Sequence, residues 1–261
     1  RAPETRVDAI DLAVTFDAAQ SEDRQGIFSI DGLTRDGFSA ETLQLDGTGR
    51  IAPGVATASF NFEANALDLG DPDAEEVLGE TVTGAAQIDW STDALISISQ
   101  LSIAGESYGL TGQADIALRE DGPEIDGSLD VRADRLAVFA GLAQRQLGGR
   151  AALQTTFVAS PLAGTFQASV NGQTTDLRVD QPEADRILAG QAQLALTTSR
   201  DENGLRATLT TLETPNANLS GDVLLKSGGS DISIEGTLAE AALILAQVTG
   251  PVQLNAQARE D

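Results

Sequence analysis

The stretch that decides the fold is residues 57–64, which read TASFNFEA. Its apolar residues alternate one by one with polar ones, at Ala58, Phe60, Phe62 and Ala64. Successive side chains of a β-strand point to opposite faces, so this alternation predicts a strand with one apolar and one solvated face. The same alternation recurs at residues 12–16, 28–30, 129–133, 166–170, 205–209 and 232–234.

Short turns are predicted between these strands. Glycine after Asp or Asn supplies the positive φ that tight hairpins need. Such pairs occur at Asp31-Gly32, Asp46-Gly47, Asp121-Gly122, Asp126-Gly127 and Asn203-Gly204. Strands joined by such turns pair with their neighbours along the chain, so we expect antiparallel meanders and an all-β fold.

Short helices are predicted where the alternation breaks, at residues 71–79, 134–147, 182–190 and 237–250. In the first of these, Asp71 precedes Pro72, which is typical of a helix N-cap followed by the first helical position. In the last, the spacing of Thr237 and Glu240 predicts a capping box.

The sequence after each predicted helix repeats. It reads Gly-x-(Ala/Val)-x-(Ile/Leu) from Gly84, Gly149, Gly190 and Gly250. Recurrence of one pattern after each helix predicts degenerate structural repeats that stack on one another. We therefore expect one elongated repeat segment with approximate modules at residues 1–70, 71–134, 135–181, 182–237 and 238–261.

Composition excludes several classes of function. The chain has 40 acidic and 16 basic residues, a net charge of −24, which repels nucleic acid. It contains no His and no Cys, which excludes disulfides, zinc sites and histidine-based proton transfer in this segment. Because Met is absent and the chain opens with Arg1, we expect a piece of a longer protein whose membrane anchor lies upstream. The apolar run 241–246 is too short to span a bilayer.

Residues 125–136 read IDGSLDVRADRL and precede an Ala/Leu-rich helix, a glycine pair and an Ala-x-Leu strand. Segments 101–112 and 212–221 share a strand-turn-strand style, with an apolar residue nine positions before the final glycine. In these features the chain resembles the TamB/AsmA-like family of translocation and assembly module proteins. The resemblance is one of repeat texture and covers most of the chain.

That resemblance implies an all-β protein with a few short helices, whose antiparallel strands form an elongated, curled, taco-like sheet with an apolar inner face. It implies a monomer in the periplasm that an upstream segment tethers to the inner membrane. The implied roles are phospholipid transport along the groove, with acyl chains as the partner, and outer-membrane protein assembly and secretion. An outer-membrane barrel assembly protein would contact another part of the chain.

An apolar face can be covered by the protein's own core or by ligand acyl chains. The sequence leaves both alternatives open for the residues that alternation places inward. The predicted lining residues are Phe60, Phe62, Ile88, Trp90, Leu153, Phe157, Phe166, Leu194, Leu196 and Leu254.

Catalytic and metal motifs are discounted. Carboxylate pairs such as Asp71 and Asp73 occur in turns and helix starts, and one Trp and one Tyr make a poor sugar platform. Asp46-Gly47-Thr48-Gly49 is interpreted as a hairpin turn, and Gly228-Gly229-Ser230-Asp231 lacks the tandem array of a calcium repeat. We therefore predict no enzyme activity, no metal and no cofactor.

Two other classes of protein stay open. An extracellular β-solenoid adhesin or passenger domain would carry a polar Asn or Thr ladder inside, whereas the predicted interior is aliphatic. A polysaccharide lyase on a β-helix would cluster basic and acidic residues in one cleft, whereas arginines are scattered along this chain.

Overall fold

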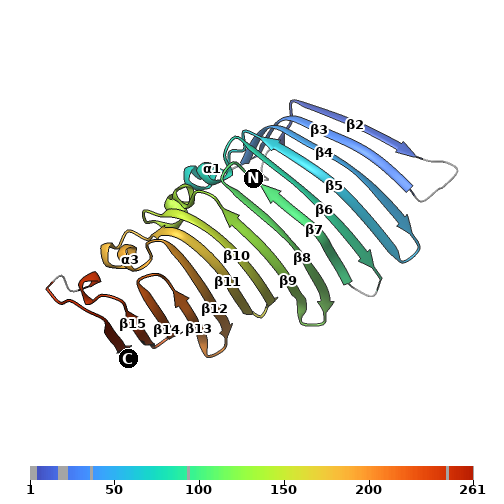
Figure 1. The fold of residues 1–261 in the computed structure, drawn as a ribbon. Coiled ribbons are helices and arrows are strands. Elements are labelled where there is room, and N and C mark those ends of the chain that lie inside the picture. Colours follow the sequence, from blue (N-terminus) through green and yellow to red (C-terminus); the bar gives the residue numbers. More distant parts are fainter. Residues whose placement is uncertain (1–4, 17–22, 36–37, 93–94, 245–246, 261) are drawn as a thin grey trace. The chain divides into compact units, whose positions relative to one another are not determined.

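The computed structural model describes residues 5–16, 23–35, 38–92, 95–244 and 247–260. The chain divides into two compact units, unit 1 (Arg1–Leu118) and unit 2 (Arg119–Asp261). Each unit is an antiparallel meander in which strands pair with their neighbours along the chain, and short helices join some of them (Figure 1). The predicted all-β fold class with a few short helices is confirmed.

Unit 1 contains the first eight strands. Their bounds are β1 (Thr5–Arg6), β2 (Ala9–Phe16), β3 (Asp23–Arg35), β4 (Phe38–Ala52), β5 (Val55–Asn65), β6 (Thr81–Ser91), β7 (Leu95–Ala104) and β8 (Tyr108–Arg119). Both β1 and β2 pair with β3, and from β3 onward each strand pairs with the next. Helix α1 (Pro72–Leu78) joins β5 to β6.

Unit 2 repeats this arrangement. Its strands are β9 (Gly122–Ala133), β10 (Gly148–Ser160), β11 (Thr165–Arg178), β12 (Gln191–Asp201), β13 (Gly204–Glu213), β14 (Ala217–Lys226), β15 (Gly229–Leu238) and β16 (Val252–Glu260). Its helices are η1 (Leu136–Phe139), α2 (Ala140–Ala143), α3 (Pro182–Ile187) and η2 (Ala241–Leu243). Each strand of the unit pairs antiparallel with the next.

Each unit has two different ends. The helices lie in connections at one end of the strands, which we call the helix end and which also has the short turns 105–107 and 214–216 (Figure 1). At the opposite end, which we call the hairpin end, the described connections are all short turns. In unit 2, residues 161–164, 202–203 and 227–228 form the hairpin turns. This separation matters below because the helices cover only one end of the sheet.

The first helix begins as predicted. The Asp71 side chain accepts a hydrogen bond from the Asp73 N–H at 3.0 Å, and Pro72 opens the helix. Gly79 ends the helix with a φ of 70°, a conformation that glycine adopts without a steric penalty. The second and third helices form within their predicted ranges but are shorter. The left-handed conformation of Gln144 ends α2, and α3 ends at Ile187 with Leu188 as its C-cap.

The predicted capping box is wrong. Thr237 lies in β15, where it pairs with Asn218 and Gln253, and is not a helix cap. The Glu240 carboxylate instead accepts a hydrogen bond from the Gly250 N–H at 2.8 Å. Strand pairing on both sides of Thr237 supplies its backbone partners, so the helix begins later, at Ala241.

Only some of the predicted turns are turns. Asp121-Gly122 and Asn203-Gly204 lie where one strand ends and the next begins, as predicted. Asp31-Gly32, Asp46-Gly47 and Asp126-Gly127 lie inside β3, β4 and β9, so those predictions and the hairpin interpretation of residues 46–49 are wrong.

The repeated glycines are equivalent in three of the four places. Gly149, Gly190 and Gly250 each have a positive φ, of 93°, 87° and 95°. Each comes two residues before the first apolar-face pair at the helix end, such as Thr174 with Ala192. In unit 1 the first apolar-face pair at the helix end is Ala64 with Val82. The residue two positions before Val82 is Glu80, not a glycine, and Gly84 lies four residues after Glu80, inside β6. The helix-and-glycine repeat is therefore present in the fold, with its first copy out of register; the module boundaries stay a prediction.

Candidate functional site: two half-exposed apolar faces

The strand register brings the predicted lining residues of unit 1 onto one face. Phe60 lies opposite Ala86, Phe62 opposite Gly84, Ala58 opposite Ile88 and Ala56 opposite Trp90. Directly opposed residues of an antiparallel pair share a face. The apolar face of unit 1 continues on the neighbouring strands through Phe28, Ile30, Leu43, Leu45, Ile96, Ile98, Ile103, Leu110, Ala114 and Ile116.

Unit 2 has an equivalent apolar face. Its register aligns Leu153 with Gly172 and Leu194, and it aligns Phe157 with Ala168. The face also holds the other lining residues predicted for this unit, Phe166, Leu196 and Leu254. The structure therefore gathers the predicted lining residues into two sets, one in each unit.

These apolar faces are not filled cores. None of the predicted lining residues is buried, and Trp90 is 42% exposed. Among the described residues, the buried hydrophobic side chains are mostly alanines, and Leu238 is the largest one that is fully buried. A closed core would bury its large side chains first, so the alternation reflects an apolar surface that stays partly open within each unit.

Two β-bulges keep this surface continuous. In β7 the register shifts between Ile98 and Leu101, and Gln100 takes a φ of 57°. In β13 a similar shift falls between Leu209 and Leu212. One extra residue would otherwise move every later side chain to the opposite face. The bulges therefore hold Leu101 and Leu212 on the apolar faces.

Glycines make room for the bulky residues of these faces. A Cβ at Gly84 would collide with the Phe62 ring and lie 2.5 Å from the Ser102 carbonyl oxygen. A Cβ at Gly47 would lie 2.9 Å from Cβ of Phe60. Gly84 lets the Phe62 ring lie across β6, and Gly47 allows close approach of β4 to Phe60 in β5. Gly47 therefore has a packing role inside a strand.

The apolar faces are closed at the helix end and open at the hairpin end. In unit 1, Ala64 and Val82 at the helix end are buried, whereas Ile51 near the hairpin end is 60% exposed. In unit 2, Ala192 at the helix end is 1% exposed, whereas Leu225 near the hairpin end is 43% exposed. An apolar ligand would therefore reach each face from the hairpin end.

One polar atom interrupts the buried end of unit 2. The Thr174 hydroxyl is buried between Ala151 and Ala192 and has no hydrogen-bond partner among the described residues. A buried hydroxyl without a partner costs about 1–3 kcal/mol.

Substitution Thr174→Val is therefore expected to raise the free energy of unfolding by about 1 kcal/mol, because valine has a similar volume and no hydroxyl. Urea denaturation followed by far-UV circular dichroism measures the change. The matched control is Thr155→Val, on the same face but half-exposed, for which we expect a change within about 0.5 kcal/mol. A loss of stability in Thr174→Val would show that the hydroxyl has a partner.

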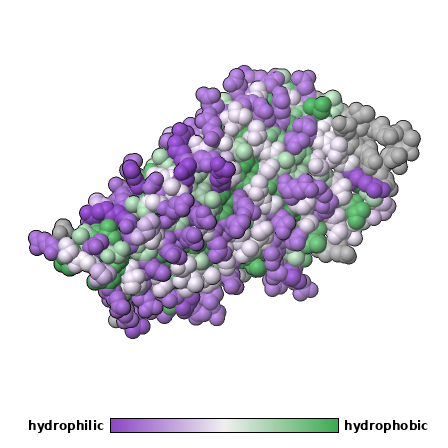
Figure 2. Space-filling model, in the orientation of Figure 1, coloured by the Kyte–Doolittle hydropathy of each residue, from purple (hydrophilic) through white to green (hydrophobic). Residues whose placement is uncertain are grey.

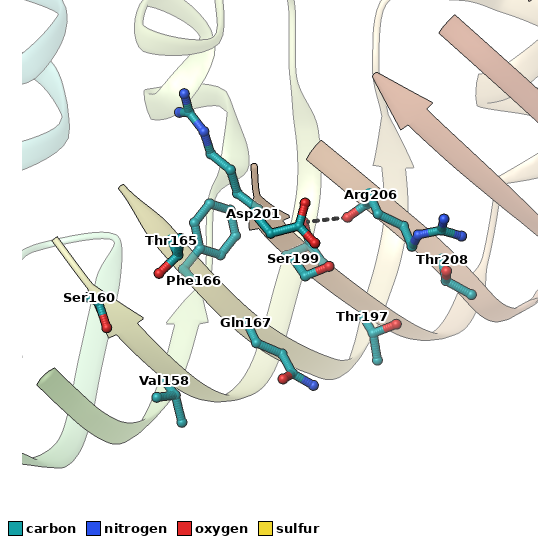
Figure 3. A pocket seen from close by; sticks show the side chains of 12 residues that line it. Val158, Ser160, Thr165, Phe166, Gln167, Thr197, Ser199, Asp201, Arg206 and Thr208 are labelled. Atoms are coloured by element: carbon teal, nitrogen blue, oxygen red, sulfur yellow. Dashed lines mark hydrogen bonds between the residues drawn. The ribbon is translucent and has the colours of Figure 1, made fainter. Parts of the chain in front are cut away.

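The other face of each strand carries mostly polar residues, such as Asp46 opposite Asn61 and Thr57 opposite Asp89. In the view of Figure 2, hydrophobic patches lie between hydrophilic side chains. A hollow of about 470 Å³ lies at the hairpin end of β10–β13 (Figure 3). Its lining includes Gln167, Ser199, Arg206 and Thr208 of the polar face, together with Phe166 and Arg200. These side chains hold no base, nucleophile and oxyanion donor in mutual reach, so this hollow suggests no reaction.

The acidic residues around α1 interact with one another. The Gly70 N–H donates to the Asp68 carboxylate at 2.7 Å and lowers the pKa of Asp68. A hydrogen bond with Asp68 raises the pKa of Glu75. Within the described ranges, no group of three or more His, Cys, Asp or Glu residues could hold a metal ion.

The sequence interpretation placed no charged residue on the apolar face, but the structure does. Arg200 lies opposite Phe166 and Leu205, two apolar-face residues. The signal was available, because Leu194, Leu196, Thr198 and Arg200 occupy alternate positions of one strand. Arg200 is the last residue of this alternating series and is charged, so local sequence favours placing it in the turn that follows β12.

No helix in the described part of the chain is both long and apolar enough to cross a bilayer. Comparison of the chain with protein-family models, with curated proteins and with solved structures finds no match.

Proposed function

We propose that this chain binds acyl chains of phospholipids along its apolar faces, as a segment of a periplasmic membrane-biogenesis protein. One observation carries the proposal: each unit has a continuous apolar face whose large side chains, such as Phe62 and Leu196, remain partly exposed. Contiguous exposed apolar surface of this kind is typical of sites that bind lipids or partner proteins. The role is binding and not catalysis.

The wider role that we propose is transport of phospholipid between the inner and outer membranes, with support for outer-membrane protein assembly and secretion. It rests on the TamB/AsmA-like texture of the sequence. A bridging protein of this kind needs an apolar path that water does not interrupt. The register supplies such a path within each unit, because each strand adds apolar residues beside those of the last.

The test compares two neighbouring residues of β6. Ile88 lies on the apolar face opposite Ala58 and Ile98, whereas Asp89 lies on the polar face opposite Thr57 and Ser97. A photo-crosslinking amino acid at Ile88 in the full-length protein in cells is expected to form phospholipid adducts, detected by mass spectrometry. The same amino acid at Asp89 is expected to form none. Crosslinks from Ile88 to the protein alone would mean that the face is a closed core and would overturn the proposal.

A further inference from the structure

The strand register of unit 2 arranges its apolar face in cross-strand rows. The row nearest the hairpin end, which we call the rim row, runs through Ile125, Ala159, Phe166, Arg200, Leu205, Leu225, Ser230 and Glu260. The next row inward contains Phe157, Ala168, Thr198, Ala207 and Val223. Arg200 is thus a permanent positive charge placed at the edge of an apolar surface.

Arg200 has no acidic partner. It is exposed, and no side chain of the described residues forms an ion pair with it, Glu202 of the adjoining turn included. The neighbouring Asp201 carboxylate accepts a hydrogen bond from the Asn203 N–H at 2.7 Å. In a chain with 40 acidic residues, an arginine without a carboxylate partner leaves its guanidinium free for an external anion.

The apolar face behind the rim row is long enough for an acyl chain. From Phe166 in the rim row to Thr174 at the buried end, β11 runs eight residues on, about 26 Å at the usual strand rise. One leaflet of a bilayer has a hydrocarbon depth of about 15 Å. An acyl chain that lies along the strands with its headgroup at the rim row therefore ends before the alanines of the helix end.

Exposure also fixes the direction of the ligand. The residues at the helix end, such as Ala192 and Leu238, are buried, whereas Leu225 of the rim row is exposed. A headgroup has no solvated position at the helix end, and burying a charge without a partner there is costly. The headgroup must lie at the hairpin end, where Arg200 is.

We propose that unit 2 binds a phospholipid in a set orientation, with its acyl chain along β11–β13 and its phosphate on the Arg200 guanidinium. This inference rests on the proposed function and adds the orientation of the lipid and the residue that contacts its phosphate. A guanidinium presents paired donors that match a phosphate. Arg200 is a positioning residue for the headgroup, and the apolar rows hold the chain.

The experiment measures equilibrium binding to the full chain by isothermal titration calorimetry with three probes. Palmitoyl lysophosphatidic acid carries the chain and the phosphate, monopalmitoylglycerol carries only the chain, and glycerol phosphate carries only the phosphate. For Arg200→Gln we expect affinity for lysophosphatidic acid to fall about tenfold, as for loss of a charge-assisted hydrogen bond. Affinity for monopalmitoylglycerol is expected to stay unchanged, which also shows that the variant is folded.

The matched control is Arg206→Gln. Arg206 pairs with Ser199, one position away in the same hairpin but on the polar face, so it changes the net charge equally without touching the rim row. We expect it to leave all affinities unchanged, and Arg200→Lys to keep part of the preference for lysophosphatidic acid. Equal losses in the two glutamine variants, or none in Arg200→Gln, would overturn the headgroup assignment while acyl binding stands.

Two further outcomes separate the proposals. Binding of glycerol phosphate as tightly as lysophosphatidic acid would mean a site for soluble phosphate and would overturn the oriented-lipid inference. Failure of both acyl probes to bind the unsubstituted protein would overturn the proposed function, and the inference with it.

Discussion

Substitution Leu238→Ala is expected to lower the free energy of unfolding by about 2–5 kcal/mol, because it leaves a cavity where the chain is best packed. Leu238 is 1% exposed and lies at the helix end of β15, between Ala217 and Val252. Its neighbours are small and held by strand pairing on both sides, so they cannot collapse into the space. Urea denaturation followed by far-UV circular dichroism measures the loss. Leu238 lies in unit 2, whereas the single tryptophan, Trp90, lies in unit 1. Tryptophan fluorescence therefore follows the unfolding of unit 1 and does not report directly on the substituted unit.

The matched control for this cavity is Leu225→Ala. Leu225 lies on the same apolar face, on the adjacent strand β14, but it is 43% exposed at the hairpin end. We expect a loss below about 1 kcal/mol there, because solvent already contacts the side chain. Equal losses for the two leucines would contradict the assignment of a closed helix end and an open hairpin end.

Substitution Gly149→Ala is expected to cost about 2–4 kcal/mol, from backbone strain and a steric clash together. Gly149 has a φ of 93°, and a Cβ there would lie 2.5 Å from the carbonyl oxygens of both Thr175 and Asp176. These backbone atoms belong to the paired strand β11, so they cannot move aside as a flexible side chain would.

Gly250→Ala separates the two contributions. Gly250 occupies the equivalent position before β16 with a φ of 95°, but no atom of the described residues lies within 4 Å of where its Cβ would be. We therefore expect only the conformational cost, about 1–2 kcal/mol. Thermal and urea unfolding of both variants measure the difference. A loss of stability in Gly250→Ala as large as that in Gly149→Ala would show that the positive φ alone requires glycine after these helices, without a contribution from the steric clash.

Glycine was the residue whose role the sequence predicted least well. After Asp or Asn it predicts a turn, and Asn203-Gly204 is one. Asp46-Gly47 has the same local chemistry but lies within β4, where Gly47 faces Phe60 of β5. Gly47 lies in a strand because it pairs with Phe60, which is 13 positions away in the sequence. A local sequence pattern around residues 46–49 does not include Phe60.

The capping box failed for a similar reason. Thr237 and Glu240 have the spacing of a helix start, but β15 continues through Leu238 because β14 and β16 pair with it on both sides. Tertiary pairing outweighed a local preference that contributes about 1 kcal/mol.

The sequence by itself determined that this protein is built of antiparallel strands with one apolar face, because alternation with period two is local and register-independent. Alternation also predicted part of that face, from Phe60 to Leu254, but did not place Arg200 on it. Only the tertiary structure decided that the face stays half-exposed, that it closes at the helix end, and that Arg200 stands at its open rim. Those properties depend on which strands are neighbours and where their bulges and helices fall, and such contacts join residues far apart in the chain.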